Sequence, residues 1–78
     1  MTRAQSYTIT LRPEPEGGFT VLVPAFPEIV SFGETEAEAS VMAKEAIELS
    51  LEHRIAEGME VPVPQDTMVR KVTVLVPA

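Results

Sequence analysis

Cysteine and tryptophan are both missing from this chain of 78 residues. Without cysteine the chain can form no disulfide framework and no thiolate metal site. Aromatic residues are few, three Phe and one Tyr, so the core must consist mainly of aliphatic side chains, Met and Ala. No apolar run approaches the roughly 18 residues of a membrane span, and the N-terminus lacks the apolar stretch of a signal peptide. We therefore expect a single cytoplasmic domain, residues 1–78, that does not contact a membrane.

Basic residues are also scarce. Six Lys and Arg stand against twelve Asp and Glu, so the formal net charge is −6 at pH 7, and the basic residues are scattered along the chain. Affinity for nucleic acids comes mainly from Lys and Arg that neutralise phosphates, so we expect no direct nucleic acid binding by this chain. A domain of this size buries only about 60 % of its unfolded surface. We therefore expect a homo-oligomer, in which association supplements the stability of the single chain.

Alternating apolar and polar residues predict strands in four segments, residues 6–12, 19–23, 29–32 and 68–76. Gly17 and Gly18 separate the first two segments and can adopt the positive φ angles that a tight hairpin turn requires. Pro24 and Pro27 bracket the turn before the third segment, because proline cannot donate a hydrogen bond within a sheet. The first three strands should therefore follow one another through short turns.

A long helix is predicted over residues 36–57, where apolar residues recur at helical spacing. Thr35 followed by Glu38 forms a capping box at its start, and Gly58 occupies the position of a C-terminal capping glycine. The apolar positions of this helix, among them Leu49, cover an arc of about 200°, wider than a single packed face requires. One side of the helix should therefore contact more than its own sheet.

These elements predict an α+β fold, a mixed four-stranded sheet with one long helix on one face, in the order β-β-β-α-β. A right-handed crossover through the helix makes the fourth strand parallel to the first and places it beside that strand.

The order of the sequence features resembles that of the small HicB-like antitoxin domain, over nearly the whole chain. The features are Tyr7-Thr-Ile-Thr-Leu, Gly17-Gly18-Phe19, the run from Pro24 to Leu49, and Glu57-Gly58-Met59. The chain has Ala25 and Glu28 where many family members carry an acidic residue and a glycine. The resemblance implies a partial ribonuclease-H-like motif. It also implies a protein partner, a HicA-type toxin, which is a small basic ribonuclease.

No set of residues predicts catalysis, a metal site or a cofactor. A ribonuclease-H-like nuclease needs carboxylates on its strands, whereas the first strand offers Thr8 and Thr10 and the fourth has no acid. Glu14 and Glu16 belong to a turn rich in proline and glycine. His53 has no Cys, no second His and no nearby Asp with which to form a cluster, and the serines at positions 31, 40 and 50 have no base at nucleophile spacing. We therefore expect a protein that is not an enzyme.

Two helix surfaces are candidate binding sites. Glu45, Glu48 and Glu52 share one side, which is either a solvated face or the surface that meets a basic toxin. The second set, Ile47, Leu51 and Ile55, is either an ordinary margin of the core or a subunit interface. We expect an antitoxin-like module that neutralises its toxin by occlusion. The alternative is a homo-oligomeric domain without a toxin partner.

Overall fold

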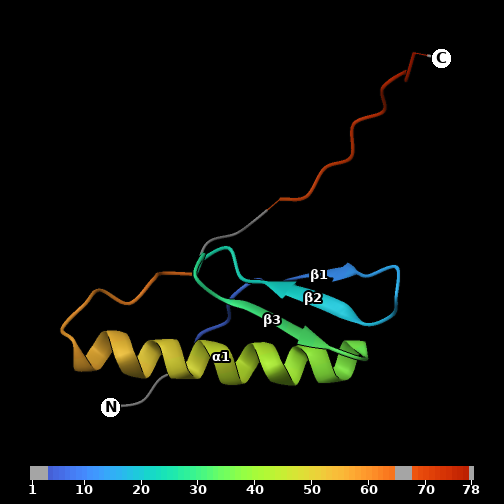
Figure 1. Ribbon diagram of the computed structural model, residues 1–78. Coiled ribbons are helices and arrows are strands. Elements are labelled where there is room, and N and C mark those ends of the chain that lie inside the picture. Colours follow the sequence, from blue (N-terminus) through green and yellow to red (C-terminus); the bar gives the residue numbers. More distant parts are fainter. Residues whose placement is uncertain (1–3, 65–67, 78) are drawn as a thin grey trace.

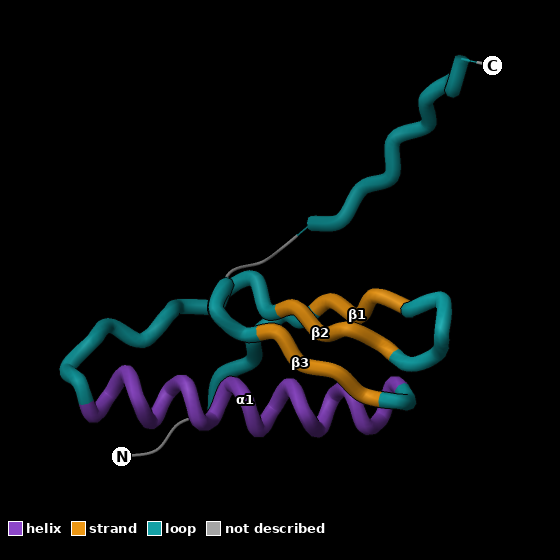
Figure 2. The backbone as a smooth tube through the Cα atoms, in the orientation of Figure 1, coloured by secondary structure: helices purple, strands orange, loops and turns teal. Residues whose placement is uncertain are grey.

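A computed structural model describes residues 4–64 and 68–77, and in it an antiparallel sheet lies against one long helix (Figure 1). Within these residues the sheet has three strands, β1 (Thr10–Pro13), β2 (Phe19–Leu22) and β3 (Val30–Gly33). They are ordered β1-β2-β3, and each neighbouring pair is antiparallel. The helix, α1 (Glu36–Ala56), runs along the sheet, as the tube view in Figure 2 shows. The prediction of an α+β fold with one long helix is confirmed.

Two short turns set the antiparallel order of the strands. In the first, Gly17 and Gly18 have φ angles of 104° and 82°, and the Glu14 N–H donates to the Gly18 carbonyl at 3.0 Å. In the second, the Phe26 N–H donates to the Val23 carbonyl at 2.9 Å. The turn residues singled out in the sequence therefore form the turns expected of them.

Both ends of α1 are capped by the residues that the sequence predicts. The Glu38 N–H donates to the Thr35 hydroxyl oxygen at 3.0 Å, which satisfies one of the free donors at the N-terminus. At the other end Gly58 has a φ of 69°, and the Met59 N–H donates to the Arg54 carbonyl at 2.8 Å. Together with the bond from the Gly58 N–H to the Ile55 carbonyl, at 3.1 Å, this is a Schellman motif.

The core lies between the sheet and the first half of α1. Its buried side chains are Val21, Val23, Phe26, Ile29, Ala39 and Ala43. Small residues on the helix allow it to approach the sheet closely. At Gly33 the approach is closest, because a Cβ added there would overlap the backbone N and Cα of Ala39. The position where β3 turns into α1 therefore has no room for a side chain.

The first strand is shorter than the alternation predicts. Its register pairs Thr10 with Leu22, the last residue of β2, so residues 4–9 have no partner in the sheet. Tyr7 is held by other contacts. Its hydroxyl donates to the Pro62 carbonyl at 2.6 Å, and its ring meets the Phe26 ring edge-on, with centroids 5.2 Å apart. This segment therefore links the turn before β3 to the chain that follows α1.

The predicted mixed four-stranded sheet is only partly confirmed, because residues 68–77 join no strand in the part of the chain that the structure describes. They project away from the sheet and helix (Figure 1). The hydrogen bond between Tyr7 and Pro62 joins positions 55 apart. A parallel strand that kept this offset would place Met68 opposite Pro13, the last residue of β1.

Candidate functional site

The three candidate acids, Glu45, Glu48 and Glu52, are all exposed on α1. The buried positions of the helix, Ala39 and Ala43, face the sheet. At 100° per residue, the three acids lie about 140° to 160° from the middle of that buried side. Helix geometry therefore places these carboxylates on the side of α1 that faces away from the sheet.

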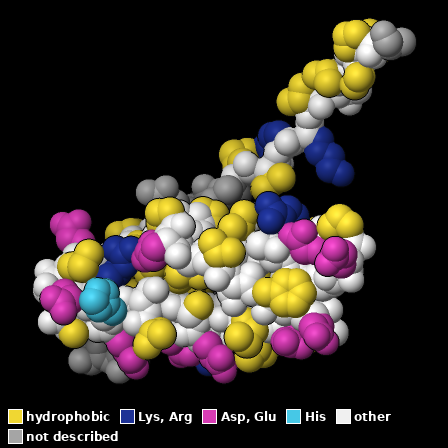
Figure 3. All heavy atoms as spheres, in the orientation of Figure 1, with side chains coloured by type: hydrophobic (Ala, Val, Ile, Leu, Met, Phe, Trp, Pro, Cys, Tyr) yellow, Lys and Arg dark blue, Asp and Glu magenta, His cyan; other side chains and the backbone are white. Residues whose placement is uncertain are grey.

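Apolar side chains lie among these acids. Val41 and Leu49 precede and follow Glu45 by one helical turn, and they are 55 % and 68 % exposed. Figure 3 shows acidic side chains with hydrophobic ones between them along the side of the molecule where α1 runs. We call Val41, Glu45, Glu48, Leu49 and Glu52 the outer helix surface. This surface combines negative charge with exposed apolar area.

The acids of the outer helix surface are little occupied by contacts within the chain. Glu48 lies 3.7 Å from the Lys44 ammonium, and both side chains are exposed, so the pair contributes little. Among the described residues, Glu45 and Glu52 make no ion pair. Two of the three carboxylates are therefore free to meet a cationic group from outside.

Leu49 was assigned to the apolar arc on the sequence, and the structure places it with the acids instead. It follows the buried Ala43 by six residues, and at 100° per residue this spacing puts it about 120° away around the helix. The angle of Leu49 around the helix axis therefore identifies it as an outward residue. The spacing of apolar residues along the sequence does not identify it.

The three candidate interface residues do not form one exposed patch. Ile47 and Leu51 are half-buried and pack against the core, whereas Ile55 is 66 % exposed. The first two therefore already have partners inside the chain. Contact of these residues with a second copy stays a prediction.

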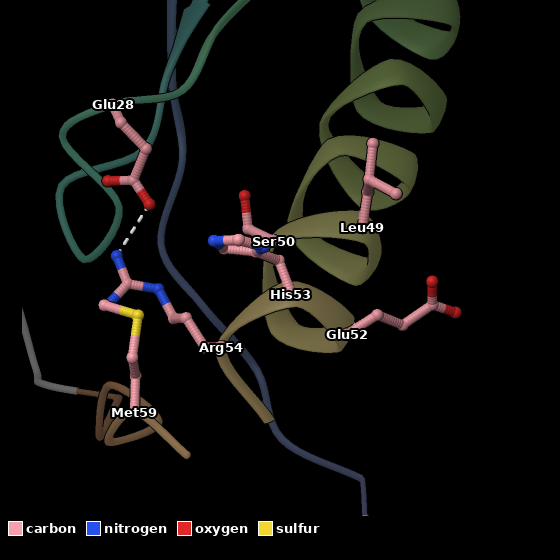
Figure 4. A pocket seen from close by; sticks show the side chains of 7 residues that line it. All are labelled: Glu28, Leu49, Ser50, Glu52, His53, Arg54 and Met59. Atoms are coloured by element: carbon pink, nitrogen blue, oxygen red, sulfur yellow. Dashed lines mark hydrogen bonds and ion pairs between the residues drawn. The ribbon is translucent and has the colours of Figure 1, made fainter. Parts of the chain in front are cut away.

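A groove lies at the C-terminal end of α1, beside the outer helix surface. It has a volume of about 830 Å³ and is lined by Glu28, Leu49, Ser50, Glu52, His53, Arg54 and Met59. Figure 4 shows Arg54 reaching toward Glu28, while Leu49 and Glu52 point away from that pair. Leu49 and Glu52 are therefore shared by the groove and the outer helix surface.

An arginine joins the groove to the core. The Arg54 Nη2 lies 2.6 Å from the Glu28 Oε1, and its guanidinium carbon lies 5.1 Å from the centre of the Phe26 ring. Because Phe26 and Glu28 both belong to the turn before β3, this one side chain fixes the turn to the end of α1. The sequence did not predict this contact, since its partners are 26 positions apart.

The Glu28 carboxyl should make folding depend on pH. A hydrogen bond from Arg54, and a second from its own backbone N–H, lower the pKa of Glu28 from its ordinary value of 4.5. Because the folded pKa is the lower one, the stabilisation is complete above about pH 4.5 and is lost as the pH falls through the folded value. Glu28→Gln should therefore show a smaller loss of stability between about pH 7 and about pH 3 than the unchanged chain.

Urea unfolding followed by circular dichroism at both pH values measures this difference, with Glu57→Gln as the matched control. Glu14 accepts hydrogen bonds from Thr20 and Arg12, which lower its pKa as well. The unchanged chain, Glu28→Gln and Glu57→Gln all keep Glu14, so its contribution to the acid dependence is the same in each. If Glu28→Gln loses as much stability in acid as the control, the pairing with Arg54 does not contribute.

The groove offers no arrangement typical of catalysis. Ser50 and His53 both line it, but no hydrogen bond joins these two described residues. Among the described residues, no group of three His, Cys, Asp or Glu side chains could hold a metal ion. Nor does the described part of the chain contain a helix long and apolar enough to cross a membrane.

Comparison with known proteins finds one family and several relatives that are similar to this chain. Residues 6–78 match the model of a family described as the HicB-like antitoxin of bacterial toxin–antitoxin systems. The chain is 38 % identical over 58 residues to antitoxin HicB of Escherichia coli K12, and 36 % identical over 58 residues to antitoxin HicB 1 of Photorhabdus laumondii. Each alignment covers 74 % of this chain, and the chain spans 42 % and 37 % of these two relatives.

A shorter relative is matched over most of its length. UPF0150 protein ssr1765 of Synechocystis is 38 % identical over 71 residues, which cover 91 % of this chain and 89 % of that protein. Similarity therefore extends to relatives of two sizes, the longer HicB antitoxins and a protein close to this chain in length.

Proposed function

The chain belongs to the HicB-like antitoxin family of bacterial toxin–antitoxin systems, and from this membership we propose that it neutralises a small basic ribonuclease of HicA type by occlusion. In this proposal the chain binds its partner and carries out no reaction, as the family's regulatory role suggests. It acts in the cytoplasm, where a ribonuclease meets RNA. It makes no direct contact with nucleic acid.

The outer helix surface is the observation that carries the proposal. Glu45 and Glu52 have no ion-pair partner among the described residues, and the chain as a whole carries −6. Opposite charges on two proteins speed their encounter and disfavour wrong partners. The exposed Val41 and Leu49 add apolar area that would be removed from water on contact. Charge would therefore govern association, and the apolar residues would slow dissociation.

The finer features of the expected fold and assembly remain proposals. A partial ribonuclease-H-like motif requires residues 68–76 to find a strand partner. A homo-oligomer through Ile47, Leu51 and Ile55 would have to rely mainly on Ile55, because the other two are half-buried. Neither feature involves the outer helix surface, so toxin binding is proposed independently of both.

Reversing the three acids should slow toxin binding. We expect the triple variant Glu45→Lys, Glu48→Lys and Glu52→Lys to associate about 10 to 100 times more slowly at low ionic strength, because electrostatic steering is lost. The difference should shrink as salt screens the charges. Surface plasmon resonance measures these rates, with the small basic protein of an adjacent reading frame as partner.

The matched control carries the same change in net charge elsewhere, as Glu16→Lys, Glu57→Lys and Glu60→Lys. All three control positions are exposed and lie outside the outer helix surface. If the two variants associate equally fast, the acids of the outer helix surface are only a solvated face. Absence of any binding by the unchanged chain would favour the alternative, a homo-oligomeric domain without a toxin partner.

A further inference from the structure

The sheet has an open edge along β3, the strand that lies nearest α1 in Figure 2. Within the described residues β3 pairs with β2 alone. The Glu14 N–H donates to the Gly18 carbonyl, so by the alternation of an antiparallel ladder the even-numbered residues of β2 bond toward β1 and the odd-numbered ones toward β3. Ser31 therefore bonds to β2, whereas the N–H and C=O groups of Val30 and Phe32 point to the open edge. Unpaired groups of this kind are a template for an added strand.

The side chains at these two positions are exposed as well. Val30 is 68 % exposed and Phe32 is 47 % exposed. Side chains alternate between the two faces of a sheet, and Ser31, which lies between them, pairs with the buried Val21. Val30 and Phe32 therefore stand on the face that points away from α1, where a sheet covered on one side usually carries polar residues. β3 thus offers an added strand both hydrogen-bonding groups and apolar side chains.

A second copy of this chain fits the edge poorly. In a two-fold antiparallel pairing, Val30 of each copy would lie opposite Phe32 of the other. The same register sets Glu28 opposite Glu34, and like charges directly opposite each other are destabilising. Among the described residues Glu34 makes no ion pair, and Glu28 stays exposed although it pairs with Arg54. β3 itself carries no charge, so the two flanking acids favour a strand that has basic residues at its ends.

A groove leads from this edge to the outer helix surface. Glu28, which comes two residues before β3, lines the groove together with Leu49 and Glu52 of α1. The helix packs mainly against β3, and Figure 1 shows the two elements side by side. Where an added strand passes Glu28, its side chains on the α1 side would therefore point into the groove. One partner can contact the edge, the groove and the outer helix surface together.

We infer that the basic partner adds a strand to the open edge of β3 and that basic residues flank this strand. The inference rests on the proposed function, because it assigns how the toxin is held. Glu28 and Glu34 would meet the basic residues, while Val30 and Phe32 would meet apolar ones. Main-chain hydrogen bonds give such a complex its affinity, and the flanking charges select the partner.

Proline tests the edge because it removes an N–H, and an edge strand tolerates proline where that N–H points away from the sheet. Val30→Pro should bind the small basic protein of an adjacent reading frame roughly 5- to 30-fold more weakly than Val30→Ala. Both variants lose the valine side chain, but only the first leaves a hydrogen-bond acceptor of the partner unpaired. Phe32→Pro against Phe32→Ala is a second pair with the same expected difference. Surface plasmon resonance measures the affinities, and circular dichroism should show α1 intact.

The flanking charge is tested separately with Glu34→Lys. It should slow association about 10-fold more than Glu57→Lys at low ionic strength, because Glu57 carries the same charge away from the edge. This comparison decides the inference if neither proline variant keeps its helix. Equal association by the two lysine variants would then overturn it.

Three further results would contradict the inference. If each folded proline variant binds as tightly as its alanine counterpart, no strand adds to β3, and the proposed function stands as long as the unchanged chain still binds. If the unchanged chain binds no such protein, the proposed function fails and the inference fails with it. If light scattering shows a lower mass for Val30→Pro alone than for Val30→Ala alone, a second copy occupies the edge instead.

Discussion

Phe26→Ala is expected to leave little folded protein. Phe26 is 0 % exposed, and its ring contacts Tyr7 edge-on and lies under the Arg54 guanidinium. Loss of a buried phenylalanine side chain costs about 3–5 kcal/mol. A domain of this size has a free energy of unfolding of about 4–12 kcal/mol. One substitution therefore removes a large share of the stability, and it releases the turn before β3 at the same time.

Urea unfolding followed by circular dichroism measures this loss. Phe32→Ala is the matched control, since the Phe32 side chain is 47 % exposed on the sheet and its removal should change stability by only about 1 kcal/mol. If the two variants unfold at the same urea concentration, Phe26 is not the centre of the core.

Gly33→Ala is expected to be the second severe change. The added methyl group would overlap the backbone N and Cα of Ala39, and backbone atoms of a capped helix cannot turn aside as a side chain does. Either β3 separates from the start of α1 or the helix shifts. Overpacking of this kind costs about 1–3 kcal/mol and occasionally more, and we expect a value at the upper end.

The control variant Gly17→Ala introduces backbone strain without atomic overlap. Gly17 has a φ of 104° and no atom within 4 Å of an added Cβ, so alanine there meets strain without overlap. Thermal unfolding should show the smaller loss for Gly17→Ala, of about 1–2 kcal/mol. Adding Ala39→Gly should restore little of the stability of Gly33→Ala, because the two closest overlapping atoms are the backbone N and Cα of Ala39, and its Cβ overlaps least. Restoration by that change would contradict the proposed cause.

The helix could be predicted from the sequence to within a residue because its ends are set locally. Thr35, Glu38 and Gly58 each act on backbone groups within a few positions of themselves. Strand ends depend on distant partners instead. Apolar and polar residues alternate as regularly around Tyr7 and Ile9 as they do in β1. These two residues nevertheless have no strand partner, because β2 ends at Leu22.

The candidate site also has some features that nearby residues set and others that depend on distant residues. Periodicity alone places Glu45, Glu48 and Glu52 on neighbouring exposed positions of one helix. The pairing of Arg54 with Glu28 depends on how the turn before β3 meets the end of α1, and no spacing along the chain encodes it. Alternation predicts a strand over residues 68–76 because it reports a local preference, whereas a strand also needs a sheet edge within reach.

The hydrogen bond between Tyr7 and Pro62 sets an order of events during synthesis. Its two partners are separated by 55 positions, so it cannot form until nearly the whole domain has been made. At about 5–20 residues per second, the ribosome needs about 3–11 s to pass from one to the other. The hairpin, β3 and the first turns of α1 contact near neighbours in the sequence and have this interval in which to assemble. The bond that joins Tyr7 to Pro62 is therefore among the last contacts that can form, although Tyr7 is made early.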